Sequence, residues 1–322
     1  MRESSSDRTS PAFVEVHPLD PEDAAITAAI RGMAAPGKGV VQPAAQARAQ
    51  FDAFMESVSP RGDVTFEAGT VGGVPGMWAI PRAWRSEEAL LHLHGGWFNF
   101  GSAKAYRHLV AHIAARAGAR AFVPDYRLAP EHPFPAATDD AMACYRGLAA
   151  SAVRRIAVTG DSAGGNLALG LASHVTAEAA SNGAILIGTA VLSPVADLTL
   201  SGASYETRAQ ADPFFTRSQV EALVRYYLGN ADAKQPLASP LFGRLAGIPP
   251  VRIHVGDDEV LLDDSLRYTE RAVAAGVDAR VDVWKGMPHG FPTSVGRLKA
   301  AATALDAVGA FLTERLRSSG GA

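Results

Sequence analysis

The sequence contains almost no cysteine and no long apolar run. Cys144 is the single cysteine among 322 residues, so an intrachain disulfide and a metal site built from several thiolates are excluded. Small and apolar neighbours at 141–145 favour a structural position for this thiol in a helix core. No apolar stretch has the length of a membrane-spanning helix, so we expect no contact with a membrane.

A dominant charge of one sign is also lacking. The formal net charge is -3 and the sequence pI is about 6.3, which gives no electrostatic signature of a nucleic-acid-binding protein. Residues 1–10 are polar and rich in serine, without the apolar core of a signal peptide. We therefore expect a cytoplasmic protein that binds no nucleic acid, with mobile ends at 1–10 and 318–322.

Hydrophobic residues make up 48% of the chain, which is enough for a large core. Beyond residue 81, short and nearly continuous apolar strands alternate with segments of helical period. This alternation predicts an α/β fold with a mostly parallel central sheet and helices on both faces. The strands are expected at 89–93, 121–123, 156–158, 189–192, 251–255 and 279–284, with an edge hairpin at 64–80.

Two regions interrupt this alternation. The N-terminal part, residues 1–60, holds a tail and two helices, the first beginning after the capping residue Asp20. Residues 199–249 carry no strand pattern. We expect a core formed by 61–198 and 250–318, covered at its strand ends by a helical cap from the N-terminal part and the 199–249 insertion.

Gly160, Ser162 and Gly164 form a Gly-x-Ser-x-Gly pattern between an apolar strand and a small, apolar helix. This is the setting of a nucleophile elbow, in which a sharp turn exposes the serine hydroxyl above the sheet. The amide of Ala163, at the start of the helix, would point to where an oxyanion forms. The pattern is common by chance, so its interpretation depends on the rest of the chain.

A serine nucleophile needs a base, and His289 is the best candidate among nine histidines. It lies in a Gly/Pro loop just after a predicted strand, which is an unusual place for a core histidine. We interpret His108 and His112 as a packed or solvated helix face, and His132 as part of a structural turn. A carboxylate should orient the base, and four acids compete after strand 251–255: Asp257, Asp258, Glu259 and Asp263.

The stretch His94-Gly95-Gly96-Trp97 closes another predicted strand. Consecutive glycines allow backbone amides to approach a substrate carbonyl, so Gly95 and Gly96 join Ala163 as candidates for an oxyanion hole. Taken alone, the two glycines could be an ordinary tight turn.

Three motifs together resemble the hormone-sensitive-lipase-like family of α/β-hydrolases, especially its bacterial esterases. His94-Gly95-Gly96-Trp97 is similar to the family's HGGG, the stretch 125–136 matches a long family signature, and Gly160-Asp161-Ser162-Ala163-Gly164-Gly165 is the family's elbow. The match covers roughly residues 60 to 318. The chain also shows the order of an α/β-hydrolase, with serine, acid and histidine in turn.

The resemblance implies Ser162 as the nucleophile and His289 as the base. It also implies oxyanion-hole amides from Gly96, Trp97 and Ala163. It places the acid at Glu259, with Asp258 as the alternative, because the family's acid motif falls on 259–263. Trp97 stands where the family has a third glycine, so its side chain must narrow or line the pocket. Asp161 is expected to hold the elbow in shape, and 125–136 to support the site from behind.

These observations predict a serine carboxylesterase for short-to-medium acyl esters or small lactones, working without metal or cofactor. Lactone hydrolysis or deacetylation of a metabolite is an alternative, and a non-catalytic small-molecule receptor is the alternative from another class. The resemblance also implies that a homodimer can form. A mostly apolar, covered pocket is expected from aromatic residues, namely Trp97, Phe214, Phe215, Tyr226 and Tyr227.

Overall fold

The computed structural model describes residues 11–40, 44–178 and 185–318, so most of both expected mobile ends lies outside it. Nine strands form one sheet in the order β1-β9-β8-β7-β6-β4-β5-β3-β2. The strands are β1 (Val14–His17), β2 (Val64–Val71), β3 (Val74–Pro81), β4 (Glu88–Leu93), β5 (Arg120–Pro124), β6 (Arg155–Asp161), β7 (Ile185–Leu192), β8 (Val251–Gly256) and β9 (Ala279–Trp284).

All strand pairs are parallel except the two made by β3, which runs against β2 and β5. Every residue of β4 is buried, and β6 is buried except at its two ends. A strand covered on both faces reads as a continuous apolar run, which is why these strands were visible in the sequence. The expected α/β fold with a mostly parallel sheet is confirmed.

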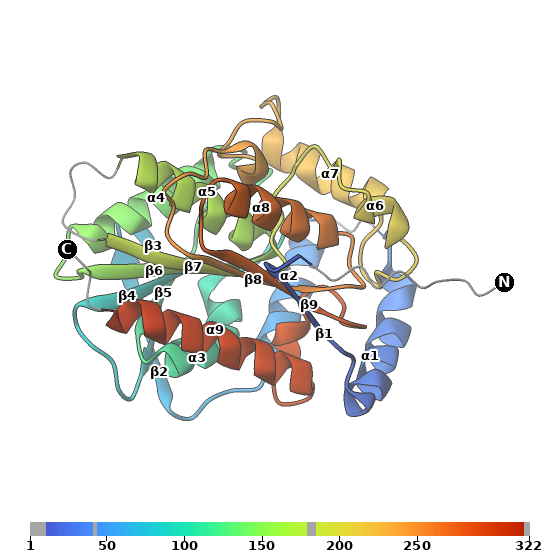
Figure 1. The fold of residues 1–322 in the computed structure, drawn as a ribbon, viewed down its shortest axis with the longest axis horizontal. Helices are drawn as coiled ribbons and strands as arrows, with labels where there is room; N and C mark the ends of the chain where they lie inside the picture. Colours follow the sequence, from blue (N-terminus) through green and yellow to red (C-terminus); the bar gives the residue numbers. More distant parts are fainter. Residues whose placement is uncertain (1–10, 41–43, 179–184, 319–322) are drawn as a thin grey trace.

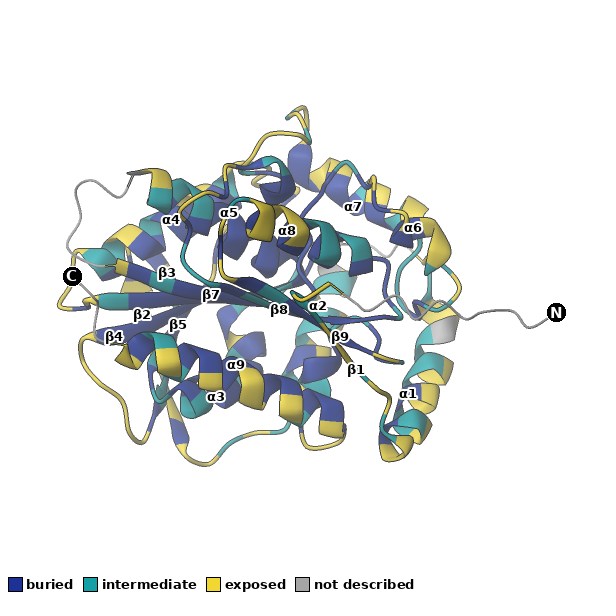
Figure 2. Ribbon diagram, viewed as in Figure 1, coloured by how far each residue is buried: buried dark blue, intermediate teal, exposed yellow. Residues whose placement is uncertain are grey.

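Helices cover both faces of the sheet, as Figure 1 shows. Helices α4, α5 and α8 lie on one face, and α3 and α9 on the other. The strands between these layers are largely buried, whereas the outer helix faces are exposed (Figure 2). The helices are α1 (Pro21–Ala34), α2 (Ala44–Glu56), α3 (Ala103–Ala117), α4 (Ala136–Ala149), α5 (Ser162–Glu178), α6 (Ser204–Thr207), α7 (Arg217–Leu228), α8 (Leu262–Ala274) and α9 (Lys299–Arg317).

Strand β1 was not expected from the sequence. It pairs in parallel with β9 at the sheet edge, with Val14 opposite Val281 and His17 opposite Trp284. Four residues with two exposed members carry too weak an apolar pattern to be recognised.

The parallel strands bring their carboxyl ends to one edge of the sheet, because neighbouring parallel strands point the same way. Strands β4, β6, β7, β8 and β9 are neighbours there, and each is followed by a loop that contains a candidate residue or its support. No helix in the described part of the chain is long and apolar enough to cross a membrane.

Candidate active site

The turn between β6 and α5 has the geometry of a nucleophile elbow. Strand β6 ends at Asp161, and the helix begins at Ser162 with φ of 53°, in the left-handed region that costs energy for a residue with a side chain. A Cβ on Gly164 would lie 1.9 Å from the carbonyl oxygen of Leu93, and one on Gly160 would lie 2.4 Å from the Gly164 oxygen. Only glycines let strand and helix approach this closely.

His289 contacts one carboxylate, that of Glu259. Its Nδ1 atom lies 2.7 Å from Oε2 of Glu259, whose side chain is fully buried. The second oxygen, Oε1, accepts hydrogen bonds from the backbone N–H of Gly256 at 2.6 Å and from the hydroxyl of Ser193 at 2.8 Å. Three donors therefore hold this carboxylate in a fixed orientation beneath the imidazole.

The other three candidate acids have different partners. Asp257 accepts from the backbone N–H of Gly286 at 2.6 Å. Asp258 forms an ion pair with Arg31 of α1. Asp263 accepts from a backbone amide at the start of α6 at 2.9 Å. Spacing in the sequence could not decide which of the four acids orients the histidine, whereas in the structure Glu259 is the one that contacts it.

The pKa of His289 is raised above its ordinary value. Burial by itself lowers this pKa, but the charge of Glu259 and its hydrogen bond to the ring outweigh burial, with smaller contributions from the charges of Asp212 and Asp161. The imidazolium form is therefore stabilised. A base that gains a proton during a reaction benefits from such stabilisation.

The loop after β4 turns back beneath the cavity. Its residues Gly96 and Trp97 have φ of 114° and 52°, and a Cβ on Gly96 would lie 2.4 Å from the carbonyl oxygen of Phe100. The backbone N–H of Gly95 donates to Oδ1 of Asp161 at 3.0 Å, so this amide is not free for a substrate oxygen. Gly95 therefore has to be removed from the expected oxyanion hole, which leaves the amides of Gly96, Trp97 and Ala163 as the candidates.

Asp161 links the elbow to this loop. Besides Gly95, it accepts a hydrogen bond from the hydroxyl of Tyr106 at 2.8 Å. The hydroxyl of Tyr126, in the 125–136 segment, donates to the His94 carbonyl at 2.7 Å, and the two rings stack at 4.1 Å. Burial lowers the pKa of His94 to about 4, so this ring is neutral near pH 7. These contacts fix the loop from below.

A cavity of about 660 Å³ lies over these groups. Ser162 and His289 both line it, and so do four of the five expected aromatic residues: Trp97, Phe214, Phe215 and Tyr226. Helix α2 contributes further apolar side chains, including Phe51, Phe54 and Met55. The walls are thus mostly apolar, although polar side chains such as Gln50 and Gln219 also line them.

Tyr227 does not belong to this wall. It is fully buried and stacks on Phe98 with ring centroids 3.7 Å apart, while its neighbour Tyr226 is half exposed. Adjacent residues of a helix point in directions about 100° apart, so only one of two neighbours can face the cavity. The expectation that both tyrosines line the pocket is wrong for Tyr227.

Two supporting residues were missed in the sequence. Ser193 directly follows β7, so its place at a strand end was a signal that could have been used. Asp212 is fully buried and accepts hydrogen bonds from the backbone amides of Phe214, Phe215 and Val260, at 2.8–2.9 Å. No local pattern marks this role, because the contact with Val260 spans 48 residues of chain.

The two histidines of helix α3 are not among the residues that line the cavity. His112 of α3 is buried and hydrogen-bonds the carbonyl of Ser59 at 2.8 Å, and His108 meets the ring of Phe66 edge-on. They form a packed helix face, one of the two expected interpretations.

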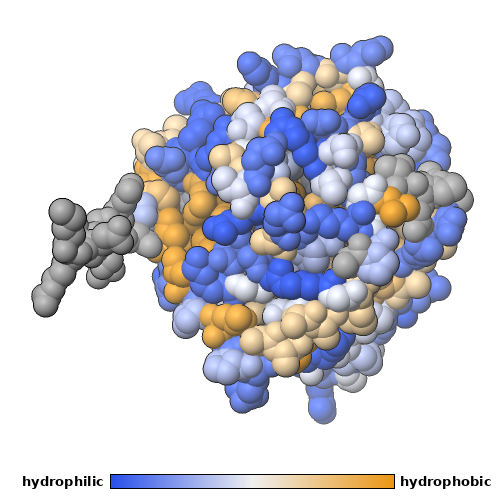
Figure 3. All heavy atoms as spheres, turned by 90° about the vertical axis from the view of Figure 1, so that its right-hand side faces the viewer, coloured by the Kyte–Doolittle hydropathy of each residue, from blue (hydrophilic) through white to orange (hydrophobic). Residues whose placement is uncertain are grey.

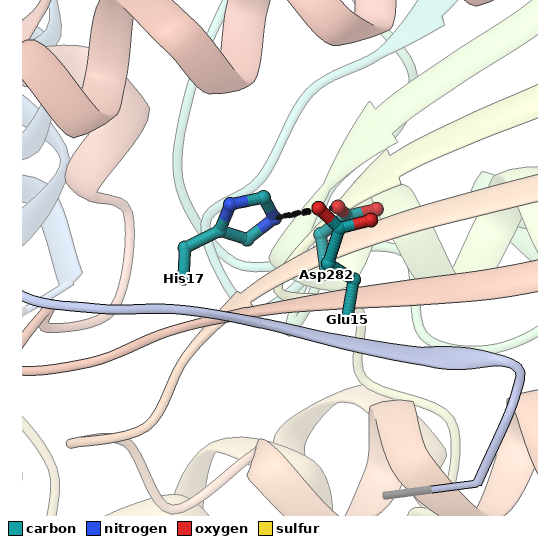
Figure 4. A group of neighbouring side chains, drawn as sticks. All are labelled: Glu15, His17 and Asp282. Carbon is teal, nitrogen blue, oxygen red and sulfur yellow. Dashed lines mark hydrogen bonds and ion pairs between the residues drawn. The ribbon is translucent and has the colours of Figure 1, made fainter.

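One group among the described residues could in principle hold a metal ion: Glu15, His17 and Asp282, at the β1–β9 edge (Figure 4). His17 hydrogen-bonds Asp282 at 2.7 Å and stacks on Trp284. Arg280 forms ion pairs with both carboxylates, so a guanidinium already compensates their charge. The described residues that line the cavity do not include these three. The group is a salt-bridge cluster that ties β1 to β9.

Comparison with known proteins agrees with the geometry. The model of a family described as having an alpha/beta hydrolase fold matches residues 90–293. An acetyl-hydrolase of Streptomyces hygroscopicus is 38% identical over 279 residues, which cover 85% of this chain and 90% of that protein. An esterase/lipase structure from an uncultured bacterium superimposes with a TM-score of 0.86 at 35% identity, covering 93% of this chain and all of that one.

A third relative gives the subfamily. The crystal structure of an esterase from the bacterial hormone-sensitive lipase family matches with a TM-score of 0.85 at 36% identity, covering 92% of this chain and 99% of that one. The fold, the elbow and the extent of these matches lead to one assignment. The chain belongs to the hormone-sensitive-lipase-like family of α/β-hydrolases and is a carboxylic ester hydrolase.

Proposed function

We propose that this protein is a serine carboxylesterase that forms an acyl-enzyme on Ser162. One observation carries the proposal: the bond between His289 and the buried Glu259, in a cavity that Ser162 also lines. A serine hydroxyl is a poor nucleophile until a base removes its proton, and an imidazole oriented by a carboxylate is such a base.

In the first step the Oγ atom of Ser162 attacks the ester carbonyl carbon while Nε2 of His289 takes the hydroxyl proton. The carbonyl oxygen becomes negative and is stabilised by the backbone N–H groups of Gly96, Trp97 and Ala163. The tetrahedral intermediate then collapses, and the alkoxide leaves as an alcohol with the proton from the imidazolium. Glu259 stabilises the positive ring throughout and keeps its own charge.

In the second step a water molecule attacks the acyl-enzyme. His289 takes a proton from the water and returns one to Oγ, so the acid is released and Ser162 is restored. Removing one oxyanion-hole donor typically lowers kcat by about 10²- to 10³-fold. The backbone N–H groups of Gly96, Trp97 and Ala163 are therefore as important to the reaction as the side chains.

The walls of the cavity suit apolar acyl and alcohol groups, and we propose acetyl and other short acyl esters as the preferred substrates. Support comes from Trp97, whose indole packs edge-on against Phe215 at 5.4 Å, while Phe215 packs against the ring of His289 at 5.2 Å. These rings occupy space beside the reacting atoms. The relative from Streptomyces is named an acetyl-hydrolase, which points in the same direction. Small lactones are the second class to assay.

The test is hydrolysis of p-nitrophenyl esters from acetate to decanoate by the wild type and by Ser162→Ala. We expect activity that falls with chain length, and a loss of roughly 10⁴-fold or more in kcat for Ser162→Ala. Cys144→Ser is the matched control, because this thiol is buried away from the cavity. Equal activity of Ser162→Ala and wild type would refute the mechanism, and ligand binding without turnover would favour a receptor.

A further inference from the structure

Arg31, at the end of helix α1, connects three segments that are far apart in the sequence. Its Nη1 atom donates to the carbonyl of Ala211 at 2.5 Å. Its Nη2 atom forms an ion pair with Asp258 and donates to the carbonyl of Gly286 at 3.2 Å. One guanidinium thus connects the 199–249 insertion with two loops. The first follows β8 and carries Glu259, and we call it the acid loop; the second follows β9 and carries His289, and we call it the histidine loop.

Each of the three segments leads directly into the catalytic groups. Asp258 is the residue before Glu259, and Gly286 lies three residues before His289. Ala211 precedes Asp212, whose carboxylate accepts the backbone N–H of Val260 at 2.9 Å, on the other side of Glu259. A shift of any of these segments would change how the carboxylate meets the imidazole.

Helix α1 is itself held at both ends, so Arg31 comes from a fixed position. At its start, buried Asp23 accepts the backbone N–H groups of Lys299 and Ala300, both at 2.8 Å, and so caps helix α9. Beyond its end, the Lys38 ammonium donates to the carbonyls of Ala209 at 2.7 Å and Asp212 at 2.5 Å. The N-terminal segment therefore spans from the core to the cap insertion.

We propose that Arg31 is a positioning residue for the triad, acting through the acid and histidine loops; the proposal rests on the function given above. Arg31 is not among the described residues that line the cavity, so it acts on the catalytic groups rather than on the substrate. A planar guanidinium can serve several acceptors in fixed directions, which the single ammonium of a lysine cannot. Helix α1 would thus have a part in the chemistry although none of its residues is among those that line the cavity.

If Arg31 positions the triad, its replacement should lower kcat and leave KM nearly unchanged. Misplacing a catalytic group by about 1 Å can lower the rate by roughly 10²-fold, whereas substrate binding in a cavity that Arg31 does not touch should change little. We expect Arg31→Ala to lower kcat by about 10- to 100-fold and to change KM by no more than about threefold. Because Glu259 would hold the imidazole less well, the acid limb of the pH profile of kcat/KM should move to lower pH.

The experiment compares kcat, KM and pH profiles of Arg31→Ala, Arg31→Lys, Asp258→Asn and the double variant Arg31→Ala/Asp258→Asn on p-nitrophenyl acetate. Asp258→Asn should show a smaller loss than Arg31→Ala, since the two carbonyl contacts remain. The double variant should lose no more kcat than Arg31→Ala alone, because each of the two changes removes the same Arg31–Asp258 ion pair. Arg61→Ala is the matched control: Arg61 pairs with Asp63 at the surface, and its side chain is 28% exposed against 32% for Arg31.

Wild-type kcat and an unmoved acid limb in Arg31→Ala would overturn the proposal, as would a change in KM alone. If Arg31→Ala does not fold, Arg31→Lys and Asp258→Asn decide the matter, and wild-type kcat in both would overturn it. An inactive wild type would refute the proposed function rather than this role. The effect of Arg31 would then be measured as the rate at which a fluorophosphonate probe labels Ser162, with slower labelling in Arg31→Ala as the expected result.

Discussion

Replacing Glu259 by glutamine would change the tautomer of His289. Oε1 of Glu259 already accepts two hydrogen bonds, from the amide of Gly256 and the hydroxyl of Ser193. The single carbonyl oxygen of a glutamine takes this position, because its NH₂ group cannot accept. The NH₂ group then faces Nδ1 of His289, which must accept instead of donating. The ring proton moves to Nε2, and Nε2 can no longer take the proton of Ser162.

The expected loss is large. A wrong tautomer in a triad of this kind lowers kcat by roughly 10⁴-fold, which corresponds to about 5 kcal/mol of transition-state stabilisation. The charge of Glu259 raises the pKa of His289, and the neutral ring is the active form, so wild-type activity rises as the pH increases through that raised pKa. Without this charge burial dominates, and the residual acid limb of Glu259→Gln should move to lower pH.

The assay is kcat and KM for p-nitrophenyl acetate between about pH 5 and 9, the range in which a histidine titrates. Glu259→Asp is the control, because it keeps the charge and shortens the side chain by one methylene group. It should retain more activity than Glu259→Gln and keep the direction of the pKa shift. A kcat for Glu259→Gln within roughly tenfold of wild type, or an acid limb that moves to higher pH, would refute the tautomer argument.

Three further predictions concern the surroundings of the serine. In Gly164→Ala the new Cβ would meet the Leu93 carbonyl at 1.9 Å, so we expect insoluble protein or a loss of more than about 4 kcal/mol in the free energy of unfolding; an unchanged urea midpoint would contradict the close approach. Trp97→Gly removes an indole from the cavity wall and suits φ of 52°, so the ratio of kcat/KM for decanoate over acetate should rise about tenfold or more; an unchanged chain-length profile would show that this ring does not set acyl length. Asp161→Asn weakens the acceptor of the Gly95 amide and should lower kcat by about 10- to 100-fold at nearly constant KM; a change confined to KM would count against a role in the oxyanion loop.

Hydrophobic side chains gather along one edge of the face shown in Figure 3, beside large hydrophilic areas. Among exposed apolar residues, Val40, Phe54 and Tyr226 also line the cavity. They come from the N-terminal part and from α7, so the apolar wall of the cavity reaches the surface at these two segments. Variants of these residues should therefore change KM more than kcat, whereas Arg31 variants are expected to change kcat more than KM.

Local sequence pattern was sufficient to predict the fold and two of the proposed catalytic groups. Continuous apolar runs identified the parallel strands, because burial on both faces leaves no polar position in them. Ser162 was recognisable because the elbow requires glycines at 160 and 164, and His289 because a Gly/Pro loop after a strand is a poor place for a core histidine. Each signal lies within about ten residues of the feature it predicts.

Contacts between distant segments decided the rest. Four acids follow β8 within seven residues, and only the packing of the β9 loop against them selects Glu259. The amide of Gly95 is taken by Asp161, 66 residues away, and the partner of Asp258 is Arg31, 227 residues away. Such pairings have no local signature, because the side chains meet only after the sheet has brought its strand ends together. The sequence by itself therefore determined the fold and the reaction type, and the tertiary structure determined which neighbouring groups meet at the proposed site.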